Sequence, residues 1–327
     1  MKRWLIFLGL LLLAVGCQND APPAVDFVQG DLAFVAHENS VHVVNIADPT
    51  QPEHVTTIDL PGWVTRVLAD GRFTYIIYEQ SVANNNGGLL ILDMTRPAQP
   101  VVRATYNLVA WPINATVQDD LLVLSHGEGT TLLDVSDRTN PQPLATLPYA
   151  PNGLYLNGDQ LLTTWGSCDF RSGFCTGGLR IYDVSNPQEP SEISYLEQNE
   201  MPGFDIALAN GHAFITGKGV WVTELTGQPT LQVNGRYETG PGYLYNGPIV
   251  IQDNIAVAAT HPANLYLLDI SQPDTPTELS HYQLRDYLSD LTVRGQYAYL
   301  VGESGLEILD ISDPANPQSV SRYQANP

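Results

Sequence analysis

The chain has 327 residues, a formal net charge of −21 and a hydrophobic fraction of 43%. This length suits one large β domain or two smaller domains, and the apolar fraction is ordinary for a globular protein. A chain this acidic excludes nucleic acid as a partner, because phosphates require Lys and Arg, and an anionic membrane surface would repel it.

The first segment has the build of a secretory signal. Lys2 and Arg3 precede an apolar run over residues 4–14, which is shorter than the roughly 20 residues that span a bilayer. The run leads to Gly16 and Cys17, and a small residue before a cysteine resembles the lipobox of bacterial lipoproteins. The resemblance implies cleavage before Cys17 and acylation of its thiol. The alternative is an ordinary signal peptide followed by a chance cysteine.

The lipoprotein interpretation places the mature protein outside the cytoplasm, held by lipid to the cell membrane or the outer membrane. Gln18 stands where lipoproteins retained at an inner membrane carry Asp, so the outer membrane is favoured in a host that has two. The expected divisions are a signal peptide over 1–16, a lipidated tether over 17–24 and a folded domain over 25–327.

One phrase recurs along the rest of the chain and predicts its architecture. It reads apolar-x-apolar-Asp-apolar-Ser, followed by two prolines. The aspartate or its replacement falls at Asn45, Asp93, Asp134, Asp183, Glu224, Asp269 and Asp310. These positions lie roughly 41–49 residues apart, a spacing typical of propeller blades.

The last unit shows the strands expected in every repeat. Residues 289–293 and 297–301 are two short strand-like runs joined by a turn at Gly295, and 306–309 and 319–323 follow on either side of the proline segment. Turn residues recur between the first two runs of each unit, and no segment keeps a helical period. Seven units of four strands predict an all-β, seven-bladed β-propeller of four-stranded antiparallel blades.

The repeat resembles the LVIVD-repeat family, whose units read much like residues 305–317. The resemblance covers nearly everything after residue 24, and it is looser where Asn45, Arg138 and Glu224 depart from the pattern. It implies a bacterial or archaeal surface propeller and supplies no catalytic residue, cofactor or metal ligand. The repeated aspartate should accept hydrogen bonds from its own turn. Because the chain begins and ends in phase, the first and last blades should close the ring by packing.

Two cysteines remain if Cys17 is lipidated. Cys168 and Cys175 flank a short polar and aromatic loop, and an extracytoplasmic compartment would allow them to form a disulfide. A metal pair is disfavoured because neither His nor a further Cys lies near them.

The irregular sequence is expected on one face of the propeller. That face holds the links between blades and the loops between second and third strands, which are lengthened at 83–88 and 168–175. Variable loops on a rigid scaffold usually carry the binding site. Alignment of the blades places four aromatic residues at equivalent positions that open the innermost strand: Trp63, Trp111, Tyr245 and Tyr287. We expect them around one mouth of the central channel, where they could stack on a ligand. Alternatively, they fill gaps between blades.

A second set of candidates is expected where the second strands end. His37, Tyr78 and His126 occupy this place in three adjacent blades, and acidic residues follow them. Such groups could bind a ligand or support acid–base chemistry. One shared metal is disfavoured, because packed sheets lie about 10 Å apart. Ordinary solvated loop residues are the alternative.

These features predict a binding or scaffold module for a protein, peptide or glycan at the cell envelope. The predicted ligand-binding residues are Trp63, Trp111, Tyr245, Tyr287, His37, Tyr78 and His126. No catalytic residue, cofactor or metal is expected, since the known hydrolase, phosphate-binding and Cys-x-x-Cys motifs are missing from the sequence. The alternatives are an envelope enzyme that acts on a polysaccharide or uses a bound cofactor through His37 and His126, and a purely architectural protein.

Overall fold

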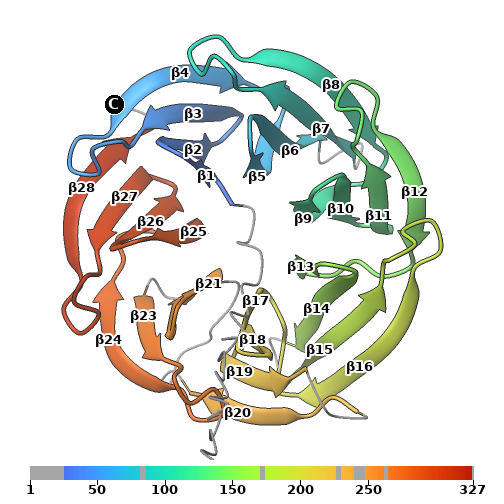
Figure 1. Cartoon of the computed structure of the whole chain (residues 1–327), viewed down its shortest axis with the longest axis vertical. Helices are drawn as coiled ribbons and strands as arrows, with labels where there is room; N and C mark the ends of the chain where they lie inside the picture. Colours follow the sequence, from blue (N-terminus) through green and yellow to red (C-terminus); the bar gives the residue numbers. More distant parts are fainter. Residues whose placement is uncertain are drawn as a thin grey trace, which may run out of the picture.

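The computed structural model describes residues 26–81, 86–169, 174–225, 230–238, 247–260 and 264–325. Cys17, the expected signal peptide and tether, and Tyr245 lie outside these ranges. The described residues form seven antiparallel sheets of four strands, arranged as blades around a central axis (Figure 1). The predicted seven-bladed propeller is therefore confirmed. The described part of the chain contains no helix long and apolar enough to cross a membrane.

Strands pair in chain order within every blade, so the first strand of each blade lies nearest the axis. The innermost strands of blades 1 to 7 are β1 (Val28–Gln29), β5 (Trp63–Asp70), β9 (Pro112–Gln118), β13 (Gly153–Asn157), β17 (Ile206–Ala209), β21 (Ile249–Gln252) and β25 (Leu288–Arg294). The second strands are β2 (Leu32–His37), β6 (Phe73–Ser81), β10 (Leu121–His126), β14 (Gln160–Asp169), β18 (His212–Gly217), β22 (Ile255–Thr260) and β26 (Tyr297–Gly302).

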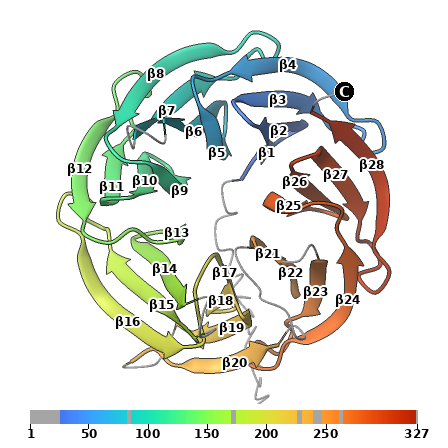
Figure 2. The same ribbon diagram turned by 180° about the vertical axis from the view of Figure 1, so that it is seen from behind.

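The outer half of each blade completes the sheet. The third strands are β3 (Ser40–Asn45), β7 (Asn86–Asp93), β11 (Gly129–Asp134), β15 (Phe174–Asp183), β19 (Gly219–Glu224), β23 (Asn264–Asp269) and β27 (Gly305–Asp310). The outermost strands, which form the outer wall in Figure 2, are β4 (Glu53–Asp59), β8 (Val101–Leu108), β12 (Gln142–Leu147), β16 (Ser191–Asn199), β20 (Val233–Tyr237), β24 (Thr277–Gln283) and β28 (Gln318–Gln324).

The core lies between neighbouring blades, where the second and third strands present large apolar side chains. Phe34, Tyr75 and Phe214 of the second strands are fully buried. Tight turns connect first and second strands, and Gly71 and Gly158 adopt the positive φ angles of 57° and 58° that such turns require. These turns hold the innermost strands in a fixed register against the core.

The repeated aspartates act as predicted, each within its own turn. Asp134 accepts a hydrogen bond from the backbone N–H of Ser136 at 2.8 Å, and Asp183 accepts one from Ser185 at 2.9 Å. Asp269 and Asp310 make the same contact with the serine two residues on. These turns lie on the face opposite the links between blades.

The ring closes by packing, because blade 1 contains only the first four strands and blade 7 only the last four. Figure 1 shows the C-terminus beside blade 1. Polar contacts also cross this seam. Asp26 accepts a hydrogen bond from Thr292 Oγ1 at 2.6 Å and pairs with Arg294 at 3.2 Å. The Nδ1 atoms of His42 and His54 both lie 2.9 Å from the hydroxyl of Tyr323. The predicted closure is thus confirmed.

Candidate functional site

Three of the four predicted aromatic residues stand at the starts of innermost strands. Trp63 begins β5, while Trp111 and Tyr287 immediately precede β9 and β25. Their exposed fractions are 65%, 42% and 51%, so none of the three simply fills the core between blades. We call Trp63, Trp111 and Tyr287 the aromatic rim.

The Trp111 ring is fixed on one side. A Cβ atom placed on Gly127 would lie only 3.0 Å from this ring, so the turn between β10 and β11 packs directly against it. The backbone N–H of Gly127 also donates to the Trp111 carbonyl at 3.0 Å. Trp111 is therefore an oriented platform with solvent-exposed surface, which suits stacking on a ligand.

A β-bulge follows each rim residue. Val64 pairs with Tyr78 but Arg66 pairs with Ile77, which leaves Thr65 as the extra residue in blade 2. Ile113 and Ser289 are the extra residues in blades 3 and 7. Side chains three residues apart on a regular strand face opposite sides, and one inserted residue brings them to the same side. The bulges therefore place the residue three positions after each aromatic on the same side as that aromatic, and these residues, Arg66, Asn114 and Asp290, line the channel cavities.

These residues belong to a ring at one level of the channel. Arg66, Asn114 and Asp290 occupy the same position within the paired strands of blades 2, 3 and 7. In blades 5 and 6 this position falls on the residues that immediately precede the innermost strands, Asp205 and Pro248, and in blade 4 the residue that immediately precedes the innermost strand is Asn152. We call these six residues the polar ring. In blade 2, for example, Tyr75 of the second strand pairs with Leu68, and Arg66 lies two positions before Leu68. The same count from the equivalent second-strand residue gives the ring residue in blades 3, 5, 6 and 7.

The polar ring surrounds two cavities. The outer cavity, about 230 Å³, opens at the strand starts, and five ring residues line it together with Ser289. The inner cavity, about 190 Å³, extends along the channel, and Arg66, Asp205 and Asp290 line it together with Asp26. Because Arg66 and Asp205 form walls of both cavities, they mark the boundary between the mouth and the channel.

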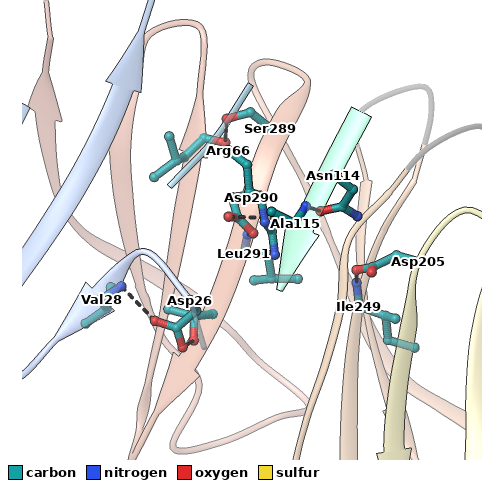
Figure 3. Close-up of polar contacts among 12 residues, drawn as sticks. Asp26, Val28, Arg66, Asn114, Ala115, Asp205, Ile249, Ser289, Asp290 and Leu291 are labelled. Atoms are coloured by element: carbon teal, nitrogen blue, oxygen red, sulfur yellow. Dashed lines mark hydrogen bonds and ion pairs between the residues drawn. The ribbon is translucent and has the colours of Figure 1, made fainter. Parts of the chain in front are cut away.

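Figure 3 shows the polar contacts at this boundary. Arg66 Nη1 lies 2.9 Å from Asp290 Oδ2, and the backbone N–H of Leu291 donates to Asp290 Oδ1 at 2.9 Å. Asp205 belongs to blade 5, and its Oδ2 accepts a hydrogen bond at 2.9 Å from the backbone N–H of Ile249 in blade 6.

The amide groups of the ring donate to neighbouring backbone. Asn114 Nδ2 donates to the carbonyl of Asn152 at 2.7 Å, and Asn152 Nδ2 donates to the carbonyl of Gly203 at 3.0 Å. These bonds link blades 3, 4 and 5 in order around the mouth. They also use donors that would otherwise be available to a ligand.

Burial makes the ring carboxylates unusual. Desolvation raises the pKa of Asp290 to about 6 although Arg66 opposes the shift, and the charges of Asp26 and Asp205 add to the rise. Burial also raises the pKa of Asp205, again against the attraction of Arg66. The side chains of Arg66 and Asp290 keep 23% and 12% of their surface exposed, so channel water moderates these effects. Perturbed carboxylates in a cavity are typical of functional sites.

The second predicted set is not brought together. His37 ends β2, and its ring centre lies 6.3 Å from that of His42 in the same blade. Tyr78 is buried, because β6 continues past it to Ser81 and its ring lies against Gly88 in the core.

His126 is also buried, contrary to the expected solvent-facing position. Its Nε2 lies 2.8 Å from Thr131 Oγ1, and burial lowers its pKa. His37 and His126 belong to separate blades, with blade 2 between them. Across the described ranges, no group of three His, Cys, Asp or Glu side chains is arranged to hold a metal ion.

Comparison with known proteins agrees with the repeat. The LVIVD repeat matches residues 27–59, 61–108, 173–196 and 287–325, which lie in blades 1, 2, 4 and 7. The chain is a seven-bladed β-propeller that contains LVIVD repeats. A comparison with curated protein sequences finds no match.

Solved structures share the propeller fold of this LVIVD-repeat protein at low identity. A Lactobacillus plantarum protein has a TM-score of 0.70 at 9% identity, with 88% of this chain and 94% of that chain covered. A functionally unknown Desulfotomaculum acetoxidans protein has a TM-score of 0.66 at 12% identity, with 91% and 96% covered. A hypothetical selenium-binding protein from Sulfolobus tokodaii has a TM-score of 0.66 at 13% identity, with 92% and 90% covered. At these identities the likeness establishes the fold alone.

The predicted disulfide is present in this LVIVD-repeat propeller. Cys168 and Cys175 are directly paired across β14 and β15, with 4.1 Å between their Cα atoms. The bond closes the hairpin between the second and third strands of blade 4. This hairpin projects on the same face as the aromatic rim, because second-to-third loops and links between blades share a face.

The sequence interpretation missed the polar ring, although part of its signal was present. The blade alignment that locates Trp63, Trp111 and Tyr287 would, three residues further on, locate Arg66, Asn114 and Asp290. In blades 4 and 5 the aligned positions hold Pro151 and Pro202 instead of aromatic residues, and the same step of three residues locates Asp205 but not Asn152, which directly follows Pro151.

Proposed function

We propose that this LVIVD-repeat propeller is a binding module that takes its ligand at the channel mouth, between the aromatic rim and the polar ring. The observation that carries the proposal is the shared register of the two sets. In three blades, a bulge aims an exposed aromatic side chain and a polar channel residue to the same side. Concave sites with a few convergent polar groups and perturbed carboxylates are typical of ligand binding.

The opposite face supports this assignment by contrast. Its turns repeat from blade to blade, and their aspartates already accept hydrogen bonds from their own backbone. The mouth departs from the repeat, because its six ring positions hold four different residue types. Departure from a regular scaffold is where binding specificity usually resides.

The binding test compares two triple variants of the full chain in detergent, on arrays of envelope glycans and peptides. Trp63→Ala/Trp111→Ala/Tyr287→Ala removes the aromatic rim, whose exposure means that the fold should persist. Val102→Ala/Ile193→Ala/Tyr195→Ala removes comparably exposed side chains from outermost strands. We expect the rim variant to bind captured ligands at least about tenfold more weakly, since stacking contributes around 1 kcal/mol for each ring. Equal binding by both variants would contradict the site.

We further propose that the propeller works outside the cytoplasm, anchored through lipid on Cys17. The lipobox-like sequence before Cys17 and the disulfide between Cys168 and Cys175 support this proposal, because disulfides persist in oxidising compartments. Labelled palmitate should enter the wild-type protein and not Cys17→Ser, which should leave the membrane fraction. Labelling of both proteins, or of neither, would contradict the anchor.

A further inference from the structure

We infer that the ligand of the channel mouth carries a primary ammonium group, which the carboxylate of Asp205 receives. The inference rests on the proposed function and adds the chemical class of the ligand. The group could belong to a free amine or to a lysine side chain, and both present the same cation to the mouth.

The pairing of charges along the channel leaves Asp205 as the odd carboxylate. Arg66 pairs with Asp290 at 2.9 Å, and Arg294 pairs with Asp26 at 3.2 Å. No cationic side chain of the described residues forms an ion pair with Asp205, whose carboxylate instead accepts backbone N–H groups, including that of Ile249. The polar ring therefore carries one positive and two negative side chains.

The position of Asp205 makes this charge accessible to a small group. Asp205 lines both the outer cavity, about 230 Å³, and the inner cavity, about 190 Å³. These volumes lie below the roughly 300–1,000 Å³ of sites that enclose drug-sized molecules. The mouth thus fits the end of a ligand, such as an alkylammonium head, while the remainder lies against the aromatic rim.

The carboxylate of Asp205 favours a ligand that donates. The side-chain amides of Asn114 and Asn152 each donate one hydrogen bond to a backbone carbonyl and Arg66 Nη1 is engaged by Asp290, while Arg66 Nε has no hydrogen-bond partner among the described residues. The carboxylate oxygens of Asp205 still have lone pairs, and an ammonium group offers three donors with a positive charge. Charge-assisted hydrogen bonds of this kind are about twice as strong as neutral ones.

Electrostatics at larger scales favours the same ligand. Aromatic faces such as those of Trp63 and Trp111 attract cations, and the net charge of −21 draws cations from a distance. Burial raises the pKa of Asp205, which means that the protein environment penalises its ionised form. An arriving ammonium group would relieve this penalty, whereas a neutral hydroxyl would leave the charge uncompensated.

The test titrates the full chain in detergent with n-butylamine and with 1-butanol, at constant ionic strength, by calorimetry. Nα-acetyl-lysine N-methylamide forms a third arm, and whether it or n-butylamine binds more tightly distinguishes a lysine side chain from a free amine. We expect both amines to bind and the alcohol not to bind. Equal responses to amine and alcohol would overturn the inference.

Two variants locate the binding. Asp205→Asn should weaken amine binding by about tenfold or more, the effect of one charged hydrogen bond. Asp183→Asn, which removes a carboxylate from an exposed turn, should leave it unchanged. Because Asn at position 205 could disturb the backbone contacts, Pro248→Lys provides a second variant that places an ammonium group in the adjacent blade of the ring. It should abolish amine binding in a folded protein, and retained binding would overturn the inference.

The outcomes separate this inference from the proposed function. If array ligands depend on the aromatic rim but the amines do not bind, the site stands and the ammonium assignment is wrong. If the rim variant binds array ligands as the wild type does, the proposed function itself is wrong.

Discussion

The turn aspartates and the channel aspartates place the same side chain in opposite environments. Asp183 and Asp310 are partly exposed, and hydrogen bonds from the serine two residues on lower the pKa of each. Asp205 and Asp290 lie in the channel, and burial raises the pKa of each. The first pair stabilises the fold when ionised, whereas ionisation of the second pair opposes it.

This difference separates the scaffold from the site. Turn aspartates satisfy their hydrogen bonds locally, so the same residue serves in blade after blade. Channel aspartates sit at ring positions where neighbouring blades contribute Asn, Pro and Arg instead. Charges that a fold holds at an energetic disadvantage are retained where function requires them, which is why the ring is the better candidate for binding.

The largest expected effect comes from breaking the channel ion pair. Arg66→Met leaves Asp290 without its cation, and we expect the free energy of unfolding to fall by about 3 kcal/mol at pH 7.5. The loss should shrink at pH 5, because Asp290 can then take up a proton. Urea unfolding at both pH values measures this.

The matched control for that variant is Arg66→Met/Asp290→Asn. Removal of both charges should restore most of the lost stability, because no buried charge remains unpaired. A double variant as unstable as the single one would show that Arg66 stabilises through packing alone, and the contrast between the two aspartate sets would weaken.

The disulfide on the mouth face should have the next largest effect. Cys168→Ala/Cys175→Ala removes a short covalent loop, and the chain-entropy relation gives a loss of about 2.5 kcal/mol. Thermal unfolding of this variant, compared with the wild type under reducing conditions, measures it. The unfolding temperatures of the variant and of the reduced wild type should agree. A variant as stable as the oxidised wild type would show that the disulfide does not stabilise the protein.

A smaller effect tests the sign of the Asp205 shift. A raised folded pKa means that the native state binds more protons than the unfolded chain above the ordinary value of 3.8, so stability falls as pH rises through the folded pKa. Asp205→Asn lacks this fall. The free energy of unfolding of the variant, minus that of the wild type, should therefore be more positive at pH 7.5 than at pH 4.5, and urea unfolding at both pH values measures it. The reverse order would contradict the burial of this charge.

The turn aspartates should show the opposite sign and the smallest effect. The pKa of Asp183 is lowered, so its contribution to stability is present above the unfolded value of 3.8 and disappears as pH falls through the folded pKa. Asp183→Ala should lower the urea midpoint slightly at pH 7.5 and converge with the wild type in strong acid. Asp183→Asn, which keeps the accepting oxygen, should stay close to the wild type at both.

The scaffold could be predicted from the sequence because its determinants are local. The recurring aspartate, the prolines and the strand-like runs fix each blade, and even the disulfide between Cys168 and Cys175 follows from one hairpin. The placement of Trp63, Trp111 and Tyr287 at strand starts also follows from aligning the repeats.

The channel site could not be predicted in the same way, because it depends on which side of the strand each side chain faces as well as on where the residue stands in the sequence. The bulges at Thr65, Ile113 and Ser289 reverse which side the following residues face, and no residue type marks them. The burial of Tyr78 and His126, which the sequence predicts as ligand-binding residues, could not be predicted because packing between blades sets how far the second strands extend and which way their last residues face. The pairing of Arg66 with Asp290 joins blades far apart in the chain.

The most direct test of the account is a crystal structure of the protein soaked with n-butylamine. The account predicts the amine at the channel mouth, with its nitrogen within hydrogen-bonding distance of Asp205 and its chain toward the aromatic rim. Amine bound only at turn carboxylates such as those of Asp183 and Asp310, with the polar ring unchanged, would contradict it.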